Sequence, residues 1–287
     1  MRVAVTGARG FLGGHAVAHL RAQGYDVVPL GRADDGTLRR LDDPSVGLAD
    51  ALAGAGAVVH LAARSVDSLA TPLSAYLGAN VALTEDLVRA AVDADVARFV
   101  LTSSRLVYPG HLRGPIREDE TAAPDTFYGL SKRMAEDVLA YYARATGLTT
   151  VSLRVAQVAG PGDGGRGALP RLVRQGLAGG PLTVAGSGAV VRDFVDVRDV
   201  VTALERAVAA PTPPPVVNIG TGGFSVAEMA REVAAQCGLG EDAIVFEPVE
   251  REDTSEYRLD TTLAREGLGW VPEHGLAGMV RDRIHRG

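Results

Sequence analysis

A tyrosine and a lysine stand four residues apart in the segment Tyr128-Gly-Leu-Ser-Lys132. The chain contains 29 lysine and arginine residues, and all of them except Lys132 are arginine. Residues four apart on a helix share one face, lysine supplies a compact point charge, and a neighbouring cation stabilises a phenolate. We therefore expect Tyr128 to have a lowered pKa and to act as a general acid and base. The alternative is a packed tyrosine and a solvated lysine on an amphipathic helix.

Three glycines, Gly7, Gly10 and Gly13, follow the short apolar run Val3–Thr6 and precede a helical pattern. Gly7 permits a tight turn, Gly10 lets the backbone approach a pyrophosphate, and Gly13 lets the helix pack closely on the strand. The alternative is a flexible turn in a chain with 35 glycines. The position between a strand and a helix favours dinucleotide binding, with Phe11 and Leu12 also in contact with the cofactor.

The end of the second expected strand bears on the type of cofactor. An acidic residue there binds the ribose diol of NAD, but this chain reads Leu30-Gly31-Arg32-Ala33. Arg32 could meet a 2′-phosphate, which favours NADP(H); the alternative is an ordinary surface arginine. Asp42 or Asp43 could reach the adenine, although both are also common loop residues.

These residues need a scaffold, and the pattern of the first half supplies one. Short apolar runs with few polar interruptions alternate with helical stretches, which predicts an α/β fold with a doubly wound parallel sheet. The expected strands are 3–6, 27–30, 57–61, 98–102 and 150–154, and the expected helices are 11–24, 72–94 and 128–146. We predict a dinucleotide-binding Rossmann domain at 1–160, to which 190–220 returns, and a small discontinuous C-terminal lobe at 161–189 and 221–287 that binds substrate.

Composition excludes several classes of protein. The chain has 287 residues, is 46% hydrophobic, and carries a formal charge of −6 without basic runs, which argues against nucleic acid as a partner. Cys237 is the only cysteine, and the six histidines show no metal-binding spacing, so we expect no metal and a structural role for His60. The first apolar run is too short for a signal or a membrane span. We therefore expect a cytoplasmic protein without a membrane partner.

Motif blocks along nearly the whole chain occur in the order found in one known family. The blocks are Thr6-Gly7-x-x-Gly10-x-x-Gly13, His60-Leu61-Ala62-Ala63, Ser103-Ser104-Arg105-Leu106-Val107-Tyr108, Tyr128-x-x-x-Lys132, Arg154-x-x-Gln157-x-x-Gly160-Pro161, Arg192-Asp193-Phe194-Val195, Asn218-Ile219-Gly220-Thr221-Gly222 and Leu268-Gly269-Trp270. With these blocks the chain resembles the extended short-chain dehydrogenase/reductase family, and in particular its nucleotide-sugar epimerase/dehydratase branch.

The resemblance implies roles for individual residues. It implies catalysis by Ser104, Tyr128 and Lys132, with Ser104 bound to the reacting oxygen and Lys132 to the nicotinamide ribose. It implies that NAD(P) is also contacted by Leu61, Ala62, Ala63, Asn80 and Val155. It further implies that substrate is bound by Ser104, Gln157, Arg192, Arg251 and Tyr257, with Arg192 as a clamp on the diphosphate. The alternative for Arg192 is a salt bridge to a neighbour such as Asp193.

Two departures from the family pattern affect the expected activity. The related 4,6-dehydratases carry an acidic pair where this chain has Arg105 and Leu106, and the related decarboxylases carry a glutamate in place of Leu106, so both reactions are disfavoured. The usual Val-Tyr-Gly is Val107-Tyr108-Pro109 here, which changes the loop over the sugar.

The expected activity is C4 epimerisation of a nucleotide-diphosphate hexose through a 4-keto intermediate. The first alternative is NADPH-dependent reduction of a nucleotide-linked 4-keto-6-deoxyhexose, which Arg32 favours. A non-catalytic dinucleotide-binding sensor is a further alternative, but such a protein has no need of Ser104, Tyr128 and Lys132. The apolar faces of helices 72–94 and 128–147, together with the resemblance, predict a homodimer.

Overall fold

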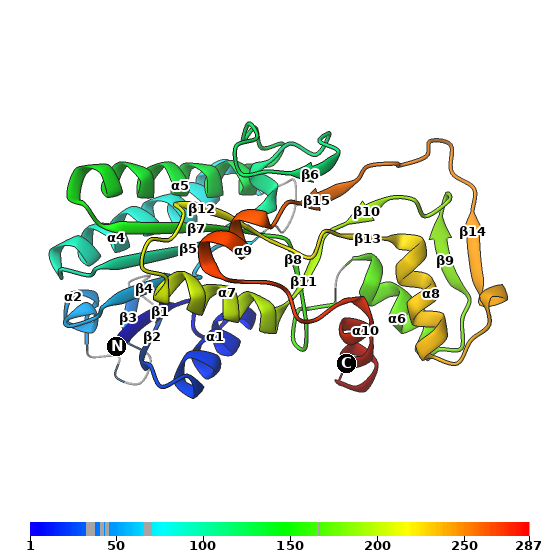
Figure 1. Ribbon diagram of the computed structural model, residues 1–287, viewed down its shortest axis with the longest axis horizontal. Helices are drawn as coiled ribbons and strands as arrows, with labels where there is room; N and C mark the ends of the chain where they lie inside the picture. Colours follow the sequence, from blue (N-terminus) through cyan, green and yellow to red (C-terminus); the bar gives the residue numbers. More distant parts are fainter. Residues whose placement is uncertain (33–37, 41–42, 44–45, 66–70, 166, 287) are drawn as a thin grey trace.

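A seven-stranded sheet forms the centre of the computed structural model, which describes residues 1–32, 38–40, 43, 46–65, 71–165 and 167–286 (Figure 1). The strand order is β12-β7-β5-β4-β1-β2-β3, and every pairing is parallel except that between β2 and β3. In chain order the strands are β1 (Arg2–Thr6), β2 (Asp26–Arg32), β3 (Leu38–Arg40), β4 (Ala57–His60), β5 (Arg98–Ser104), β7 (Thr149–Val155) and β12 (Val216–Ile219).

Helices cover both faces of this sheet (Figure 1). Alternate strand residues face opposite sides, so Val3 and Val5 of β1 lie in the core beneath α1, α7 and α9, whereas Ala4 lies in the core beneath α2, α4 and α5. The helices are α1 (Phe11–Ala22), α2 (Leu48–Leu52), α4 (Leu83–Asp93), α5 (Phe127–Thr146), α7 (Val197–Ala209) and α9 (Thr262–Leu268). The predicted α/β class with a doubly wound, mostly parallel sheet is confirmed.

One long helix contains a π-helical turn. It begins as α3 (Leu73–Tyr76), continues as the π-helix η1 (Leu77–Ala82), and ends as α4. π-helical turns inside α-helices are rare and occur frequently at functional sites. Here the turn carries the buried Asn80.

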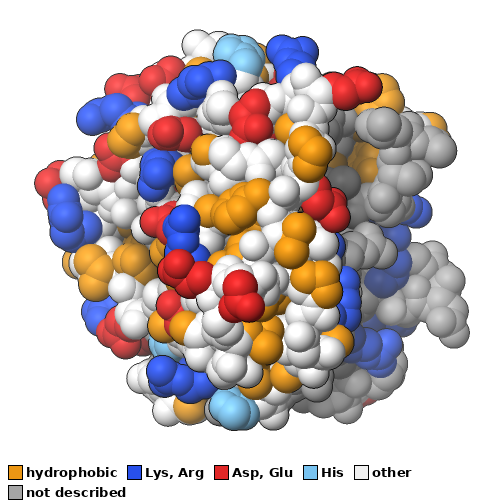
Figure 2. Space-filling view, turned by 90° about the vertical axis from the view of Figure 1, so that its right-hand side faces the viewer, with side chains coloured by type: hydrophobic (Ala, Val, Ile, Leu, Met, Phe, Trp, Pro, Cys, Tyr) orange, Lys and Arg blue, Asp and Glu red, His pale blue; other side chains and the backbone are white. Residues whose placement is uncertain are grey.

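A smaller lobe lies beside the carboxyl ends of the parallel strands (Figure 1). Its core joins α6, α8 and α10 to a parallel pair of strands. The lobe consists of α6 (Ala168–Leu177), β9 (Leu182–Ala185), α8 (Val226–Gln236), η3 (Glu241–Ala243), β14 (Ile244–Glu247) and α10 (Leu276–Arg286). Viewed from this end, apolar side chains lie among charged ones (Figure 2), and Val245 and Phe246 of β14 are exposed.

Short strands connect the two parts. They are β6 (Gly114–Ile116), β8 (Gln157–Ala159), β10 (Val191–Arg192), β11 (Phe194–Asp196), β13 (Phe224–Ser225) and β15 (Tyr257–Leu259), and η2 (Arg105–Val107) follows β5. The domain boundaries remain a prediction. Within the predicted lobe segment 221–287, however, α9 lies on the large sheet, because Ala264, Leu268 and Trp270 belong to the core shared with α7.

Across the described part of the chain, none of the helices combines the length and the apolar character needed to traverse a bilayer.

Candidate active site

The glycine loop is closed by contacts that only glycine permits. Gly7 has a φ of +68°, and a Cβ on it would stand 2.8 Å from the amide nitrogen of Ala62. A Cβ on Gly13 would collide with the carbonyl oxygen of Gly7. Gly10 donates its N–H to that same carbonyl at 2.8 Å and is the N-cap of α1. The loop therefore presents the N-terminus of α1 without side chains in front of it, as an anion-binding turn requires.

A cavity of about 550 Å³ lies over this loop. Its lining includes Gly7, Arg9, Gly10, Gly31, Arg32, Leu61, Ala62, Ala63 and Arg64. The exposed Arg32 thus stands at the end of β2 beside the helix N-terminus, where the sequence pattern had placed it. A cradle without Cβ atoms, a helix N-terminus and three arginines fit a dinucleotide with its phosphates. Asp42, the other residue predicted at the adenine end, lies outside the described residues.

A chain of buried hydrogen bonds holds the strand end beside the loop. Thr6 Oγ1 accepts the N–H groups of Leu61 and Ala62 at 3.2 and 3.1 Å, and lies 2.7 Å from His60 Nδ1. His60 Nε2 lies 3.1 Å from Thr84 Oγ1, which donates to the carbonyl of Asn80 at 2.5 Å. Burial, aided by the charge of Lys132, lowers the pKa of His60 to about 3, so the ring is neutral at pH 7. His60 thus positions the 60–62 segment, consistent with the predicted structural role.

Asn80 fastens the same segment from the π-helical turn. Its Oδ1 accepts the N–H of Arg64 at 2.7 Å, while its Nδ2 donates to the Arg64 carbonyl at 3.1 Å and to Ser131 Oγ at 2.9 Å. Ser131 Oγ in turn donates to the carbonyl of Tyr128. Asn80 is 2% exposed and makes no contribution to either large cavity, so its predicted contact with the cofactor remains a prediction while its contact with the Tyr128 helix is structural.

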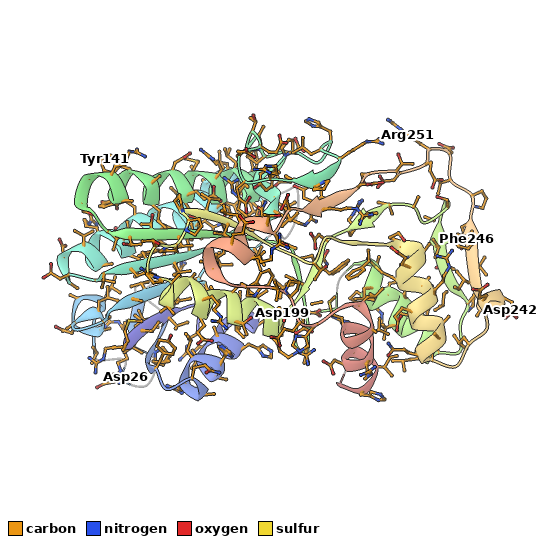
Figure 3. The ribbon with its side chains drawn as sticks, in the orientation of Figure 1. Asp26, Tyr141, Asp199, Asp242, Phe246 and Arg251 are labelled. Atoms are coloured by element: carbon orange, nitrogen blue, oxygen red, sulfur yellow. The ribbon has the colours of Figure 1, made fainter. Side chains whose placement is uncertain are left out.

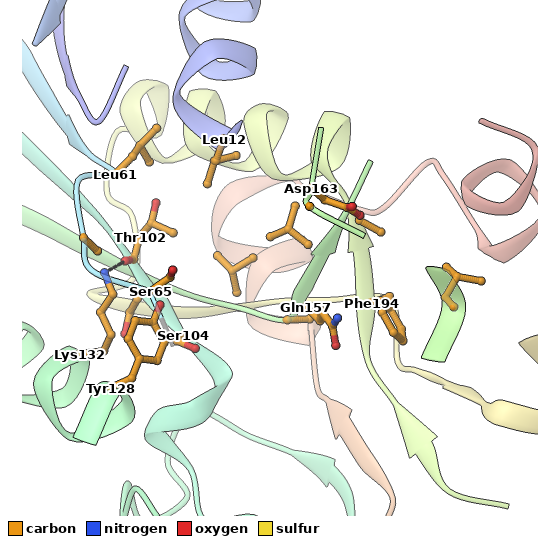
Figure 4. Close-up of a pocket in the computed structure, with 18 of the residues that line it drawn as sticks. Leu12, Leu61, Ser65, Thr102, Ser104, Tyr128, Lys132, Gln157, Asp163 and Phe194 are labelled. Carbon is orange, nitrogen blue, oxygen red and sulfur yellow. Dashed lines mark hydrogen bonds between the residues drawn. The ribbon is translucent and has the colours of Figure 1, made fainter. Parts of the chain in front are cut away.

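Ser104, Tyr128 and Lys132 point into one cavity of about 650 Å³ (Figure 4). Ser104 ends β5 and caps η2, where its Oγ accepts the N–H of Leu106 at 3.2 Å. Tyr128 and Lys132 lie on the first turns of α5, whose N-cap Thr126 accepts the N–H of Gly129 at 3.0 Å. Lys132 donates to the carbonyl of Thr102 at 2.8 Å (Figure 4).

The pKa of Tyr128 is opposite in direction to the expectation. Burial raises it to about 12, and the hydrogen bond from Ser104 opposes the rise only in part. Burial also lowers the pKa of Lys132 to about 8, while Glu136 opposes this change. The expected lowering of the Tyr128 pKa is therefore wrong for the isolated protein, because loss of hydration outweighs the hydrogen bond from Ser104, and Tyr76 adds to the rise.

A buried polar network lies behind α5 and β7. Glu136, 5% exposed, accepts Arg154 Nη2 at 2.8 Å and Ser103 Oγ at 2.5 Å. Arg154 Nη1 also donates to the hydroxyl of Tyr108 at 2.8 Å, and that hydroxyl donates to Asn218 Oδ1 at 2.9 Å. Every member is hydrogen-bonded, so the network ties η2, α5 and three strands of the large sheet (β5, β7 and β12) into a rigid support.

The remaining wall of the main cavity includes predicted and unpredicted residues. It is lined by Leu12, Leu61, Ala63, Val155 and Gln157, whose contacts with cofactor or substrate stay predictions. Sequence reasoning did not find Asp163, which accepts the N–H groups of Gly160 and Gly165 and pairs with Arg283 of α10. It also missed Thr102, whose Oγ1 is the one buried side-chain polar atom without a hydrogen-bond partner in the described part of the chain. Phe194 lies beside Gln157, its register partner between the paired strands β11 and β8 (Figure 4).

Arg192 and Tyr257 line a separate cavity of about 280 Å³, together with Arg105. Arg192 pairs with Asp253 at 2.9 Å and donates to Ser255 Oγ at 2.8 Å. The alternative pairing with Asp193 is not found, because Asp193 is fully buried and accepts the backbone N–H groups of Leu259 and Thr221. Arg251 is exposed on the loop between β14 and β15 (Figure 3) and does not line these cavities.

Comparison with known proteins places this site in a family. The model of the NAD dependent epimerase/dehydratase family matches residues 3–220. This chain belongs to that family. Its fold, its enzyme class and the nucleotide-sugar branch predicted from the motifs are thereby confirmed.

Individual relatives share most of their length with the chain. It is 34% identical to a UDP-glucose 4-epimerase of Mycolicibacterium smegmatis over 310 residues, covering 99% of this chain and 97% of that protein. It is 30% identical to a dTDP-6-deoxy-L-talose 4-dehydrogenase (NAD(P)(+)) of Kitasatospora kifunensis over 316 residues, covering 98% and 94%. A solved structure of MoeE5 in complex with UDP-glucuronic acid and NAD superposes with a TM-score of 0.83 and 36% identity, covering 99% and 98%.

Proposed function

We propose that the protein is a nucleotide-sugar C4 epimerase that acts on a nucleotide-diphosphate hexose through a 4-keto intermediate. The observation that carries the proposal is the convergence of Ser104, Tyr128 and Lys132 on one cavity beside the glycine loop. The family, the UDP-glucose 4-epimerase relatives and the bound UDP-sugar of MoeE5 support a nucleotide sugar as the substrate.

Each residue of the proposed catalytic set has a distinct task. Tyr128 exchanges a proton with the sugar C4 hydroxyl, and the hydrogen bond from Ser104 keeps its hydroxyl oriented. Ser104 Oγ accepts the N–H of Leu106, and its single proton, which bonds Tyr128 in the isolated protein, is proposed to turn to the reacting oxygen once substrate is bound. Lys132, anchored on the Thr102 carbonyl, supplies a positive charge within the cavity. A nicotinamide cofactor supplies hydride acceptance and return at C4, and its oxidised form carries a charge that favours the phenolate.

The residues proposed to hold the cofactor come from the glycine loop, the strand ends and the two helices beside them. They are Gly7, Gly10, Phe11, Leu12, Gly13, Arg32, Leu61, Ala62, Ala63, Asn80, Tyr128, Lys132 and Val155. The orphan Thr102 Oγ1 beside Lys132 is a further polar group that a bound ligand satisfies.

Arg32 carries the finer proposal that NADP(H) is preferred. Arg32→Ala is expected to weaken binding of NADPH about 10- to 100-fold, the loss of one charge-assisted contact, and to change binding of NADH little. Dissociation constants from the fluorescence of the two reduced cofactors measure this. Arg21→Ala, an exposed arginine on α1, is the matched control. Tighter binding of NADH than NADPH by the wild type would contradict the preference.

The alternative activity is reduction of a nucleotide-linked 4-keto-6-deoxyhexose. Arg32 at the cofactor cavity and the relationship to a 4-dehydrogenase favour it. A non-catalytic sensor receives less support, since its function does not require the convergent Ser104, Tyr128 and Lys132.

A panel of nucleotide sugars distinguishes these activities. The protein is incubated with UDP- and dTDP-linked hexoses, with and without NADPH, while sugar interconversion and absorbance at 340 nm (the nicotinamide band) are followed together. An epimerase interconverts sugars with no net loss of NADPH, whereas a ketoreductase consumes NADPH in proportion to product. Failure of both reactions across the panel would refute the proposed function.

Four side chains remain proposed substrate ligands besides Ser104. Gln157 faces the main cavity, while Arg192 and Tyr257 face the smaller one. Arg192 remains the proposed diphosphate clamp, because a guanidinium binds phosphate with two parallel hydrogen bonds. Arg251 is the least supported, because it is exposed on the loop before β15.

The outer faces of α4 and α5 carry the proposed dimer contact. They form a mostly apolar groove lined by Val81, Met134, Val138, Tyr141 and Tyr142, with Glu85 and Asp137 also in its wall, and Tyr141 is 61% exposed. Light scattering at micromolar concentration is expected to give a dimer for the wild type. Tyr141→Glu is expected to weaken it about 30-fold or more, the effect of removing an aromatic anchor worth about 2 kcal/mol. Phe246→Glu, at the opposite end of the molecule (Figure 3), is the control, and a monomeric wild type would contradict the proposal.

A further inference from the structure

A half-buried arginine beside the proposed catalytic serine has no acidic partner in the described part of the chain. Arg105 follows Ser104 directly, and its guanidinium carbon lies 4.6 Å from the centre of the Tyr257 ring. No carboxylate forms an ion pair with Arg105 among the residues that the structure describes. Loss of hydration lowers the pKa of this guanidinium, and the nearby Arg192 lowers it further. A desolvated charge without a counter-ion is costly, so its presence requires a reason.

The surroundings hold Arg105 in this place. The hydroxyl of Tyr257 donates to the backbone carbonyl of Arg105 at 2.7 Å, which fixes the first residue of η2. The Tyr257 ring then supports the guanidinium through a cation–π contact. The nearest buried acid, Asp193, is engaged by the N–H groups of Leu259 and Thr221 and by the Thr221 hydroxyl. The positive charge therefore remains available to a ligand.

Arg105 and Arg192 line the same cavity of about 280 Å³. The acids nearest to it are also engaged: Asp125 Oδ2 accepts the N–H of Gly110 at 2.6 Å, and Asp253 pairs with Arg192. Two guanidinium groups that face one small cavity repel each other. An anion bound between them replaces this repulsion with attraction to both groups.

This cavity adjoins the main one through the residues of two short turns. Ser104 lines the main cavity, whereas Arg105, the next residue, lines the smaller one. At the start of α5, Tyr128 lines the main cavity and Thr126 lines the smaller one. A sugar whose C4 oxygen is held by Ser104 and Tyr128 therefore has its neighbouring ring substituents next to Arg105. In a hexuronic acid the carboxylate is borne by C5, the ring carbon adjacent to C4.

We propose that Arg105 binds the C5 carboxylate of the substrate, so that the enzyme acts on nucleotide-linked hexuronic acids in preference to neutral hexoses. The inference rests on the proposed function, since it names the sugar class for the same catalytic set. Guanidinium and carboxylate form two parallel, charge-assisted hydrogen bonds. A neutral hydroxymethyl group in this position leaves the guanidinium desolvated and unpaired, which disfavours the neutral sugar.

Interconversion of UDP-glucuronic acid and of UDP-glucose tests the inference. The wild type is expected to prefer UDP-glucuronic acid by about 10- to 100-fold in kcat/KM, as one charge-assisted pair provides. Arg105→Met is expected to remove most of that preference by lowering kcat/KM for the uronate alone. Arg105→Lys, which keeps the charge without the planar fork, is expected to retain part of it. Arg113→Met, an exposed arginine in the following loop, is the matched control and is expected to keep the preference.

The possible results distinguish the proposed contact between Arg105 and the carboxylate from the proposed epimerase activity. A wild type that epimerises UDP-glucose as well as UDP-glucuronic acid overturns the inference and leaves the epimerase proposal standing. A wild type that converts neither sugar overturns both. An equal loss for both sugars in Arg105→Met, with weaker binding of UDP itself, assigns Arg105 to the diphosphate and also overturns the inference. Thermal unfolding of each variant shows whether it remains folded.

Discussion

Replacing Tyr128 with phenylalanine is expected to lower kcat at least ~100-fold, the typical contribution of a general acid and base. The variant loses only the hydroxyl, so the ring stays in contact with Tyr76 and the fold is retained. With a pKa raised to about 12, the phenol of the isolated protein is protonated at neutral pH and is suited to donating a proton. The measurement is the single-turnover rate of sugar interconversion with cofactor bound.

The control for this prediction lies on the same helix. Tyr141→Phe removes an exposed hydroxyl from α5 and is expected to leave kcat unchanged. Binding of the dinucleotide to Tyr128→Phe, followed by fluorescence, separates a loss of chemistry from a loss of cofactor. Full kcat in Tyr128→Phe with normal cofactor binding would show that another group moves the proton.

Replacing Lys132 with methionine is expected to abolish detectable turnover and, at the same time, to stabilise the fold. Lys132 is 3% exposed, and its pKa falls from 10.5 to about 8 on burial. That difference corresponds to a cost on the order of 3 kcal/mol for keeping the ammonium charged. Methionine removes this cost, but it leaves the Thr102 carbonyl without a donor. The lost hydrogen bond destabilises the fold by about 1 kcal/mol. We expect a net gain of about 1–3 kcal/mol, measured by urea unfolding at pH 7.

The gain in stability expected for Lys132→Met decreases as the pH rises. Below pH 8 the lysine is charged in both the folded and the unfolded protein, so the full cost is present. Between pH 8 and 10.5 the folded protein releases this proton while the unfolded chain keeps it, so this residue makes the wild type more stable as the pH rises. The difference between Lys132→Met and the wild type is therefore expected to shrink from pH 7 to pH 10. A variant that is less stable than the wild type at pH 7 would contradict the desolvation argument.

The local sequence pattern was sufficient to predict the glycine loop with its flanking strand and helix. It was also sufficient to place Tyr128 and Lys132 on one helix face. The Gly7, Gly10 and Gly13 spacing follows from one strand, one turn and one helix, all within a dozen residues, and the structure shows the steric contacts that require glycine there. Tyr128 and Lys132 share a helix, so their common face also followed from local geometry. Placing Ser104 beside them needed long-range information, which the order of family motifs supplied.

The features that sequence reasoning missed depend on contacts between distant segments. The direction of the Tyr128 pKa shift is set by burial beneath packed neighbours, which no spacing of residues reveals. Asp163 and Arg283 meet across 120 positions of chain, and Arg105 meets Tyr257 across 152. The separation of Arg192 and Tyr257 from the main cavity likewise depends on how the short strands pair between the two parts of the molecule.

The π-helical turn at Leu77–Ala82 has a consequence for how this helix tolerates insertion and deletion. A π-helical turn holds one residue more than the α-helical path around it, and each α-helical residue advances the azimuth by about 100°. Because the turn absorbs that residue, removing one residue from it would restore a regular helix with both halves in phase, and α4 would keep Leu87 and Val88 in the core. Rewinding all of its residues as α-helix would instead turn the two halves about 100° apart, so that either Asn80 left the Arg64 backbone or Leu87 and Val88 left the core. The π-helical geometry thus lets this helix hold one more residue without losing either contact.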